Sequence, residues 1–247
     1  MTPNPIRTVL SSIQRHRVRA LLMGGQACVL YGAAEFSRDT DFAILADSAN
    51  LTRLSKALAD LDAQVIAVPP FRLAYLRRGH AVHFRCHHPD AARMRIDVMS
   101  RMRGVDPFPK LWARRTTVTL PDGFSCDLLS LPDLVKAKKT QRDRDWPVIR
   151  RLIETHYFQH RHQPTSTHAT FWLRELRTPQ LLVEVARAQP ALCRRIARVR
   201  PLVALASEGR LEAIEEALRE EEILDRARDR QYWIPLRKEL ERLRHPR

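Results

Sequence analysis

Residues 18–46 constrain the fold most, because a buried strand, a glycine pair, a short helix and a second strand follow one another without interruption. Residues 18–23 are apolar except for Arg19 and are expected to form a buried strand, and the periodicity of 26–34 and of 40–46 predicts a helix and then a second strand. Gly24 and Gly25 stand where the first strand passes into the helix, so the backbone can approach an anion closely. Alternation of strand and helix predicts an α/β fold.

The second strand of this stretch carries two acids one residue apart. In a strand, Asp39 and Asp41 point to one face and Phe42 points to the other. Two neighbouring carboxylates need a cation, and Mg²⁺ suits such a pair because it prefers a few carboxylate ligands and substrate phosphate oxygens. A turn cap at Asp39 and an ordinary strand start at Asp41 are the structural alternative.

A third acid, Asp97, lies inside the apolar segment 94–99, which we expect to be a strand. Alternation places Asp97 on the same face as Arg95 and Met99. An ion pair between Asp97 and Arg95 or Arg93 is the structural alternative to a role in chemistry.

The rest of the chain divides into an α/β part and a helical part. Ser130 is expected to cap a helix that contains the basic run 136–144, and Pro147 should start a second helix near Asp145 that ends near His156. We also expect helices at 6–16 and 51–61, the latter capped by Asn50, and strands at 64–68, 81–86, 116–120 and 124–129. The predicted organisation is a core at 1–158, a polar linker at 159–170 and a helical C-terminal domain at 171–247.

The order strand, Gly-Gly, helix, Asp-x-Asp and later strand aspartate resembles the nucleotidyltransferase superfamily typified by DNA polymerase beta. The stretches GGQACVLYGAAEFSRDTDFAIL and SLPDLVKAKKTQRDRDW are similar to minimal bacterial nucleotidyltransferases, including AbiEii-type toxins of toxin–antitoxin systems. The resemblance covers roughly 18–156. It implies a core with a mixed β-sheet flanked by helices, and transfer of a nucleoside monophosphate from a triphosphate such as ATP to a hydroxyl group.

The resemblance also implies roles for particular residues. Asp39 and Asp41 would bind Mg²⁺ or Mn²⁺, and Asp97 would share the metal and help to deprotonate the acceptor. Asp145 matches a recurrent acid with a supporting or structural role. The nucleotide site would consist of Gly24, Gly25, Gln26, Ser37, Lys138 and Arg142.

Lys138 and Arg142 are spaced i, i+4, so on one helix they would share a face and repel each other unless an anion lay between them. A triphosphate is a candidate for that anion. Lys139 and Asp143 have the same spacing and would form an ordinary ion pair.

A formal net charge of +15 indicates an anionic partner, and we expect RNA, perhaps tRNA, as the acceptor. An arginine-rich proteome is the alternative explanation of the charge. Other readings are a protein hydroxyl or a small molecule as acceptor, a degenerate protein that binds nucleotide or RNA without catalysis, and a toxin controlled by an antitoxin protein.

Other features indicate no further chemistry. The four cysteines form no CxxC pair, and we expect a reducing, cytoplasmic location without membrane attachment. The histidines lack regular ligand spacing and were expected to be solvated: His87, His88, His156, His160, His162 and His168.

Overall fold

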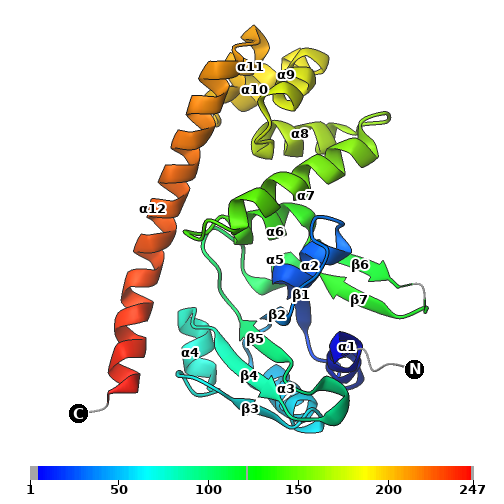
Figure 1. The fold of residues 1–247 in the computed structure, drawn as a ribbon, viewed down its shortest axis with the longest axis vertical. Helices are drawn as coiled ribbons and strands as arrows, with labels where there is room; N and C mark the ends of the chain where they lie inside the picture. The colour runs from blue at the N-terminus through cyan, green and yellow to red at the C-terminus, as the bar shows by residue number, and fades with distance from the viewer. Residues whose placement is uncertain (1–4, 121, 246–247) are drawn as a thin grey trace. The chain divides into compact units, whose positions relative to one another are not determined.

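The computed structural model describes residues 5–120 and 122–245. Over these residues the protein is mixed α/β, as predicted, and its described strands form one seven-stranded mixed sheet in the order β3-β4-β5-β2-β1-β7-β6 (Figure 1). The strands are β1 (Ala20–Met23), β2 (Asp39–Ile44), β3 (Ala63–Val65), β4 (Val82–Cys86), β5 (Arg95–Met99), β6 (Thr116–Thr119) and β7 (Ser125–Leu128).

The centre of the sheet is formed by the strands that carry the predicted acids. β2 pairs antiparallel with β1 and parallel with β5, and β5 pairs antiparallel with β4. β7 joins β1 in parallel and forms an antiparallel hairpin with β6, and these two strands match those predicted at 116–120 and 124–129. Hairpin β6–β7 and strand β3 therefore lie at opposite ends of the sheet (Figure 1).

The chain forms two compact units. The first contains residues 1–137 and 232–247, and the second contains residues 138–231. Helices that lie within the first unit are α1 (Pro5–Arg15), α2 (Gly24–Leu30), α3 (Ser48–Asp60), α4 (Leu73–Arg78) and α5 (Phe108–Ala113). Ser12 of α1 donates a hydrogen bond to the carbonyl of Ala57 in α3, which ties these two helices together. Neither α4 nor α5 was predicted, because each spans only six residues and shows little periodicity.

The prediction that Asn50 caps α3 is wrong. The helix begins at Ser48, and Asp47 is the N-cap residue whose side chain accepts a hydrogen bond from the backbone N–H of Asn50. Asn50 is fully buried, accepts from the N–H of Arg19 and donates to the carbonyls of Arg19 and Leu45. It therefore joins α3 to the segments beside β1 and β2.

The second unit is built from helices. They are α7 (Asp145–His160), α8 (Ser166–Glu175), α9 (Pro179–Ala188), α10 (Pro190–Ala197), α11 (Leu202–Glu208) and most of α12 (Leu211–Arg244). The segment predicted as a linker, 159–170, contains the end of α7, a short turn and the start of α8. The two units divide at 137/138 and at 231/232, so α12 from Tyr232 onward belongs to the first unit.

The basic run at 136–144 does not lie within a single helix. Helix α6 (Leu131–Lys138) begins after Ser130 as predicted, but it ends at Lys138, and Arg142 lies in the non-helical segment before α7. The expectation that Lys138 and Arg142 share a helix face is therefore wrong. Helix α7 begins at Asp145, as Pro147 predicts, and continues to His160.

Among the described residues, no helix combines the length and the apolar character that a membrane span requires.

Candidate functional site

The three predicted acids lie on one face of the sheet. In the parallel pairing of β2 with β5, Asp41 lies opposite Asp97, and Asp39 lies opposite Arg95. Alternation along the strands puts all four side chains on the same face, while the buried Thr40 and Phe42 point to the other. The register thus brings two acids from distant parts of the sequence together.

Gly24 is fitted closely against this group. It has a positive φ of 65°, and a Cβ atom added there would lie 1.8 Å from Oδ2 of Asp41. Met23, which precedes it, pairs with Asp41 in the sheet. Only glycine fits both the backbone conformation and the space, so the backbone at the start of α2 directly adjoins a carboxylate.

The other predicted residues of this segment hold the loop that leads into β2. A Cβ atom at Gly25 would lie 2.4 Å from Oγ of Ser37. Ser37 donates to the carbonyl of Asp39 at 3.1 Å, and the buried Gln26 donates to the carbonyl of Ser37 at 2.7 Å. Gln26 and Ser37 therefore position the chain immediately before the two aspartates.

Arg95 and His83 contact the third acid. Arg95 donates two hydrogen bonds to the carboxylate of Asp97, both 2.8 Å long, and Nδ1 of His83 lies 2.9 Å from Oδ1 of Asp97. Burial tends to raise the pKa of Asp97, but the hydrogen bonds from His83 and Arg95 outweigh it and lower the pKa. Asp97 is thus held ionised, and the structural alternative of an Arg95–Asp97 ion pair is present in this structure.

All three acids raise the pKa of Arg95. Its hydrogen bonds to Asp97 raise its pKa, and the charges of Asp39 and Asp41 act in the same direction. One guanidinium thus serves as counter-charge on a face that carries three carboxylates. Such a face fits a hard divalent cation, because Mg²⁺ prefers carboxylate oxygens and retains positions for water and phosphate.

Lys138, Arg142 and Asp145 form a separate group in the second unit. Nζ of Lys138 lies 3.0 Å from Oδ1 of Asp145, and Nε of Arg142 lies 3.4 Å from Oδ2. Burial tends to raise the pKa of Asp145, but the charge of Lys138, with smaller contributions from Thr140 and Arg142, lowers it. The anion between the two cations is thus a side chain of the protein itself.

The predicted pair of Lys139 with Asp143 is wrong, since α6 ends before both residues. Nζ of Lys139 lies 2.7 Å from Glu175 of α8, and Asp143 pairs with Arg226 of α12. The basic run therefore ties together elements of the second unit.

Two arginines of the first unit, Arg114 and Arg115, have acidic partners. Arg114 contacts the buried Asp133 at 2.6 Å and also Asp106, and Arg115 contacts Asp127 at 3.1 Å. These contacts reduce the positive charge available to an RNA backbone.

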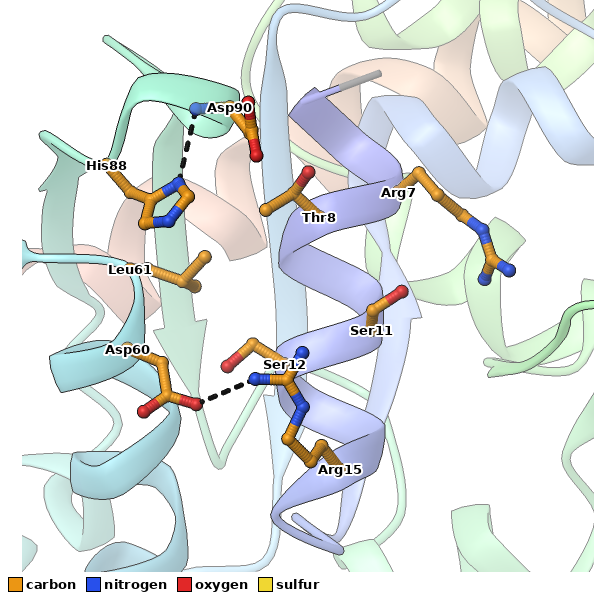
Figure 2. A pocket seen from close by; sticks show the side chains of 9 residues that line it. All are labelled: Arg7, Thr8, Ser11, Ser12, Arg15, Asp60, Leu61, His88 and Asp90. Atoms are coloured by element: carbon orange, nitrogen blue, oxygen red, sulfur yellow. Dashed lines mark hydrogen bonds and ion pairs between the residues drawn. The ribbon is translucent and has the colours of Figure 1, made fainter. Parts of the chain in front are cut away.

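The structure contains two cavities in the first unit that the sequence did not predict. One, of about 360 Å³, lies between α1, the end of α3 and the segment 88–90 (Figure 2). Its Arg15 and Asp60 form an ion pair of 3.2 Å (Figure 2). The other, of about 430 Å³, lies on the Phe42 face and is lined by Trp112, which the guanidinium groups of Arg19 and Arg115 approach. None of the three predicted acids lines either cavity.

The structure also contains a histidine cluster that was not predicted from the sequence. His156, His160 and His168, which we expected to be solvated, come together between α7 and α8. The i, i+4 spacing of His156 and His160 was the available signal, but only the helical hairpin adds His168.

Comparison with known proteins adds no family: no family model matches the chain, and no curated protein is similar enough to count as a match.

Proposed function

We propose that the protein is a Mg²⁺- or Mn²⁺-dependent nucleotidyltransferase that moves a nucleoside monophosphate from a triphosphate to a hydroxyl acceptor. The observation that supports this most directly is the register that sets Asp41 beside Asp97, with Asp39 on the same face. The close approach of Gly24 to Asp41 is the second support, because it leaves no room for a side chain beside the carboxylate.

Asp39 and Asp41 hold the metal, and Asp97 shares it. The metal supplies positive charge to the phosphate oxygens and lowers the pKa of a bound hydroxyl. The acceptor oxygen forms a bond to the α-phosphorus as the bond to the bridging oxygen breaks, and pyrophosphate leaves with that electron pair. Asp97 accepts the hydrogen bond of the acceptor hydroxyl and helps to remove its proton.

The contact between Arg95 and Asp97 decides between the catalytic proposal and its main alternative, a protein that binds without catalysis. Each oxygen of Asp97 accepts a hydrogen bond from Arg95, so a metal held by Asp97 would share these oxygens with the guanidinium or displace it. A protein in which Arg95 keeps the metal away from Asp97 would be a degenerate member that binds nucleotide or RNA without turnover. Arg95 is therefore the residue whose substitution distinguishes the two.

RNA, and tRNA in particular, is the proposed acceptor, because the net charge of +15 favours a polyanion. Gly24 and Gly25 remain the proposed ligands of the triphosphate. A role of Lys138 and Arg142 in nucleotide binding remains a separate prediction, because both contact Asp145. An antitoxin protein that blocks the site is proposed as the regulator if the enzyme acts as a toxin.

The test is incubation of the protein with Mg²⁺, each α-³²P-labelled nucleoside triphosphate in turn and total tRNA, followed by denaturing electrophoresis. Label on RNA with the parent protein, and none with Asp41→Asn, is the expected result. Label on protein instead redirects the search to a polypeptide acceptor. Absence of label, together with RNA binding that does not depend on Mg²⁺, supports the non-catalytic alternative.

A further inference from the structure

We propose that His156, His160 and His168 form a binding site for one divalent transition-metal ion of the Zn²⁺ type, within the second unit and separate from the aspartate site. The three side chains offer nitrogen atoms that all lie within 4.8 Å of one another. A single ion needs only small side-chain movements to contact all three, because zinc–imidazole bonds are about 2.0–2.1 Å long.

The local fold produces this cluster. His156 and His160 are one turn apart on α7, and their rings stack with centroids 4.4 Å apart. His168 lies in the first turn of α8, and its ring centroid is 5.0 Å from that of His156 and 4.6 Å from that of His160. The turn at 161–165 between the helices is short, so an ion held here would fasten α7 to α8.

The donor set favours a transition metal over Mg²⁺, because imidazole nitrogen suits Zn²⁺, Cu²⁺ and Ni²⁺ and hard cations prefer oxygen. All three side chains are half-buried. Burial, and then the neighbouring His160 and His168, lower the pKa of His156 to about 4, which keeps this imidazole neutral near pH 7. A neutral ring has the lone pair that a metal requires.

Hydrogen bonds at Nδ1 distinguish the three ligands. Nδ1 of His160 lies 2.9 Å from the carbonyl of His156 and can only donate to it, which leaves the lone pair of His160 on Nε2. Nδ1 of His156 instead accepts a hydrogen bond of 3.0 Å from the indole N–H of Trp172. The backbone N–H of Thr165 donates to Nδ1 of His168 across a longer distance of 3.5 Å.

An exchange of partners at His156 follows from this arrangement. A neutral imidazole has a single lone pair, and the indole of Trp172 can only donate. When His156 binds a metal, its lone pair is used and the hydrogen bond from Trp172 is lost. Metal binding therefore has to compete with Trp172, and the fluorescence of Trp172 should report it.

The experiment is titration of the untagged full-length protein with Zn²⁺ by calorimetry and with Co²⁺ by visible absorption. At the histidines we expect one tightly bound ion per chain, with a dissociation constant of about micromolar or below and the intense Co²⁺ bands of a four-coordinate site; an ion at the aspartates is a second, separate binding event. His160→Ala should weaken binding at least about tenfold, whereas His87→Ala, which removes an exposed histidine of the first unit, should leave it unchanged.

Two further variants keep the test decisive. Trp172→Phe keeps an aromatic ring but removes the competing donor, so it should bind Zn²⁺ about three- to tenfold more tightly than the parent. Asp41→Asn should keep the tight Zn²⁺ site and its Co²⁺ bands, which separates the histidine site from the proposed Mg²⁺ site. Circular dichroism without metal should be the same for all variants.

A parent protein that binds no Zn²⁺, or a His160→Ala variant that is folded and binds as tightly as the parent, would overturn the proposal. So would a Trp172→Phe variant that is folded and binds Zn²⁺ more weakly.

Discussion

Asp41 and Asp97 lie directly opposite each other in the parallel pairing of β2 with β5, on the face of the sheet that Gly24 approaches. Parallel neighbours of this kind keep two carboxylates close along a rigid hydrogen-bonded ladder. The fold therefore imposes a proximity of like charges that a cation must offset, and Arg95 offsets part of it in this structure. The proposed metal and the guanidinium of Arg95 would both reduce the repulsion between these carboxylates.

Removal of one charge from the aspartate pair should abolish turnover without unfolding the protein. We expect Asp39→Asn and Asp41→Asn each to lower Mg²⁺-dependent transfer by at least about 100-fold, because in the proposed mechanism both carboxylates hold the ion. Neither substitution removes apolar contacts, so circular dichroism and the midpoint of urea unfolding should stay close to those of the parent. Turnover near the parent level in either variant would take that residue out of the mechanism.

Gly24→Ala should destabilise the protein through a steric clash with Asp41. Both Gly24 and Gly104 have φ near +65 to +69°, but an added Cβ atom meets nothing within 4 Å at Gly104. Gly104→Ala is therefore the matched control and should cost only the backbone term of about 1–2 kcal/mol. Gly24→Ala should cost about 1–3 kcal/mol more, measured as free energy of unfolding in urea. Equal losses in the two variants would show that the approach to Asp41 is looser than described.

Arg95→Met should change how the carboxylates bind metal. Methionine keeps most of the length of the side chain and removes the two hydrogen bonds to Asp97. Mn²⁺ serves as the probe for the proposed Mg²⁺ site, because it can be followed by electron paramagnetic resonance. If the metal competes with Arg95 for Asp97, the dissociation constant for Mn²⁺ should fall by about tenfold or more in Arg95→Met. The control is Arg85→Met, which removes an exposed guanidinium from the neighbouring strand β4. Weaker Mn²⁺ binding in Arg95→Met would assign Arg95 a role in building the site.

The pH dependence of stability should report the ionised state of Asp97. Its pKa in the folded protein lies below the ordinary value of 3.8, so its stabilising contribution is complete well above that value and is lost as the pH falls through the lowered pKa. Asp97→Asn lacks this contribution. The difference in free energy of unfolding between parent and variant should therefore shrink between pH 6 and pH 3. A constant difference would contradict the lowered pKa.

Lys138 and Arg142 should respond differently to substitution, although both contact Asp145. The side chains of Lys138 and Asp145 are 16% and 5% exposed, so Lys138→Met leaves a buried carboxylate with less compensation and should cost about 2–4 kcal/mol. The side chain of Arg142 is 59% exposed, so Arg142→Ala should cost less than about 1 kcal/mol. If Arg142 binds the triphosphate, its variant should show weaker nucleotide binding at unchanged stability. An unchanged nucleotide affinity would leave Arg142 a structural role alone.

Local patterns predicted each of the seven described strands, because the pattern of a strand lies in adjacent residues. The apolar run before Gly24, the alternation around Asp39 and Asp41, and the acid within the strand at 95–99 needed only the two-residue period of a strand. The start of α7 followed from Pro147 in the same way. Where a short polar residue had two uses, local reasoning chose the wrong one: Asn50 resembles a helix cap, but it is a buried link between segments.

The sequence by itself thus determined the mixed α/β class, the position of the glycine pair and the residue types on each face of β2 and β5. Only the tertiary structure decided which side chains lie close together. It placed Asp41 beside Asp97, Arg95 and His83 in contact with Asp97, Asp145 in contact with Lys138, and His168 beside His156 and His160. The physical reason is that periodicity fixes the direction of a side chain relative to its own backbone. Pairing of strands and docking of helices depend on contacts between segments far apart in the chain, and no local pattern encodes them.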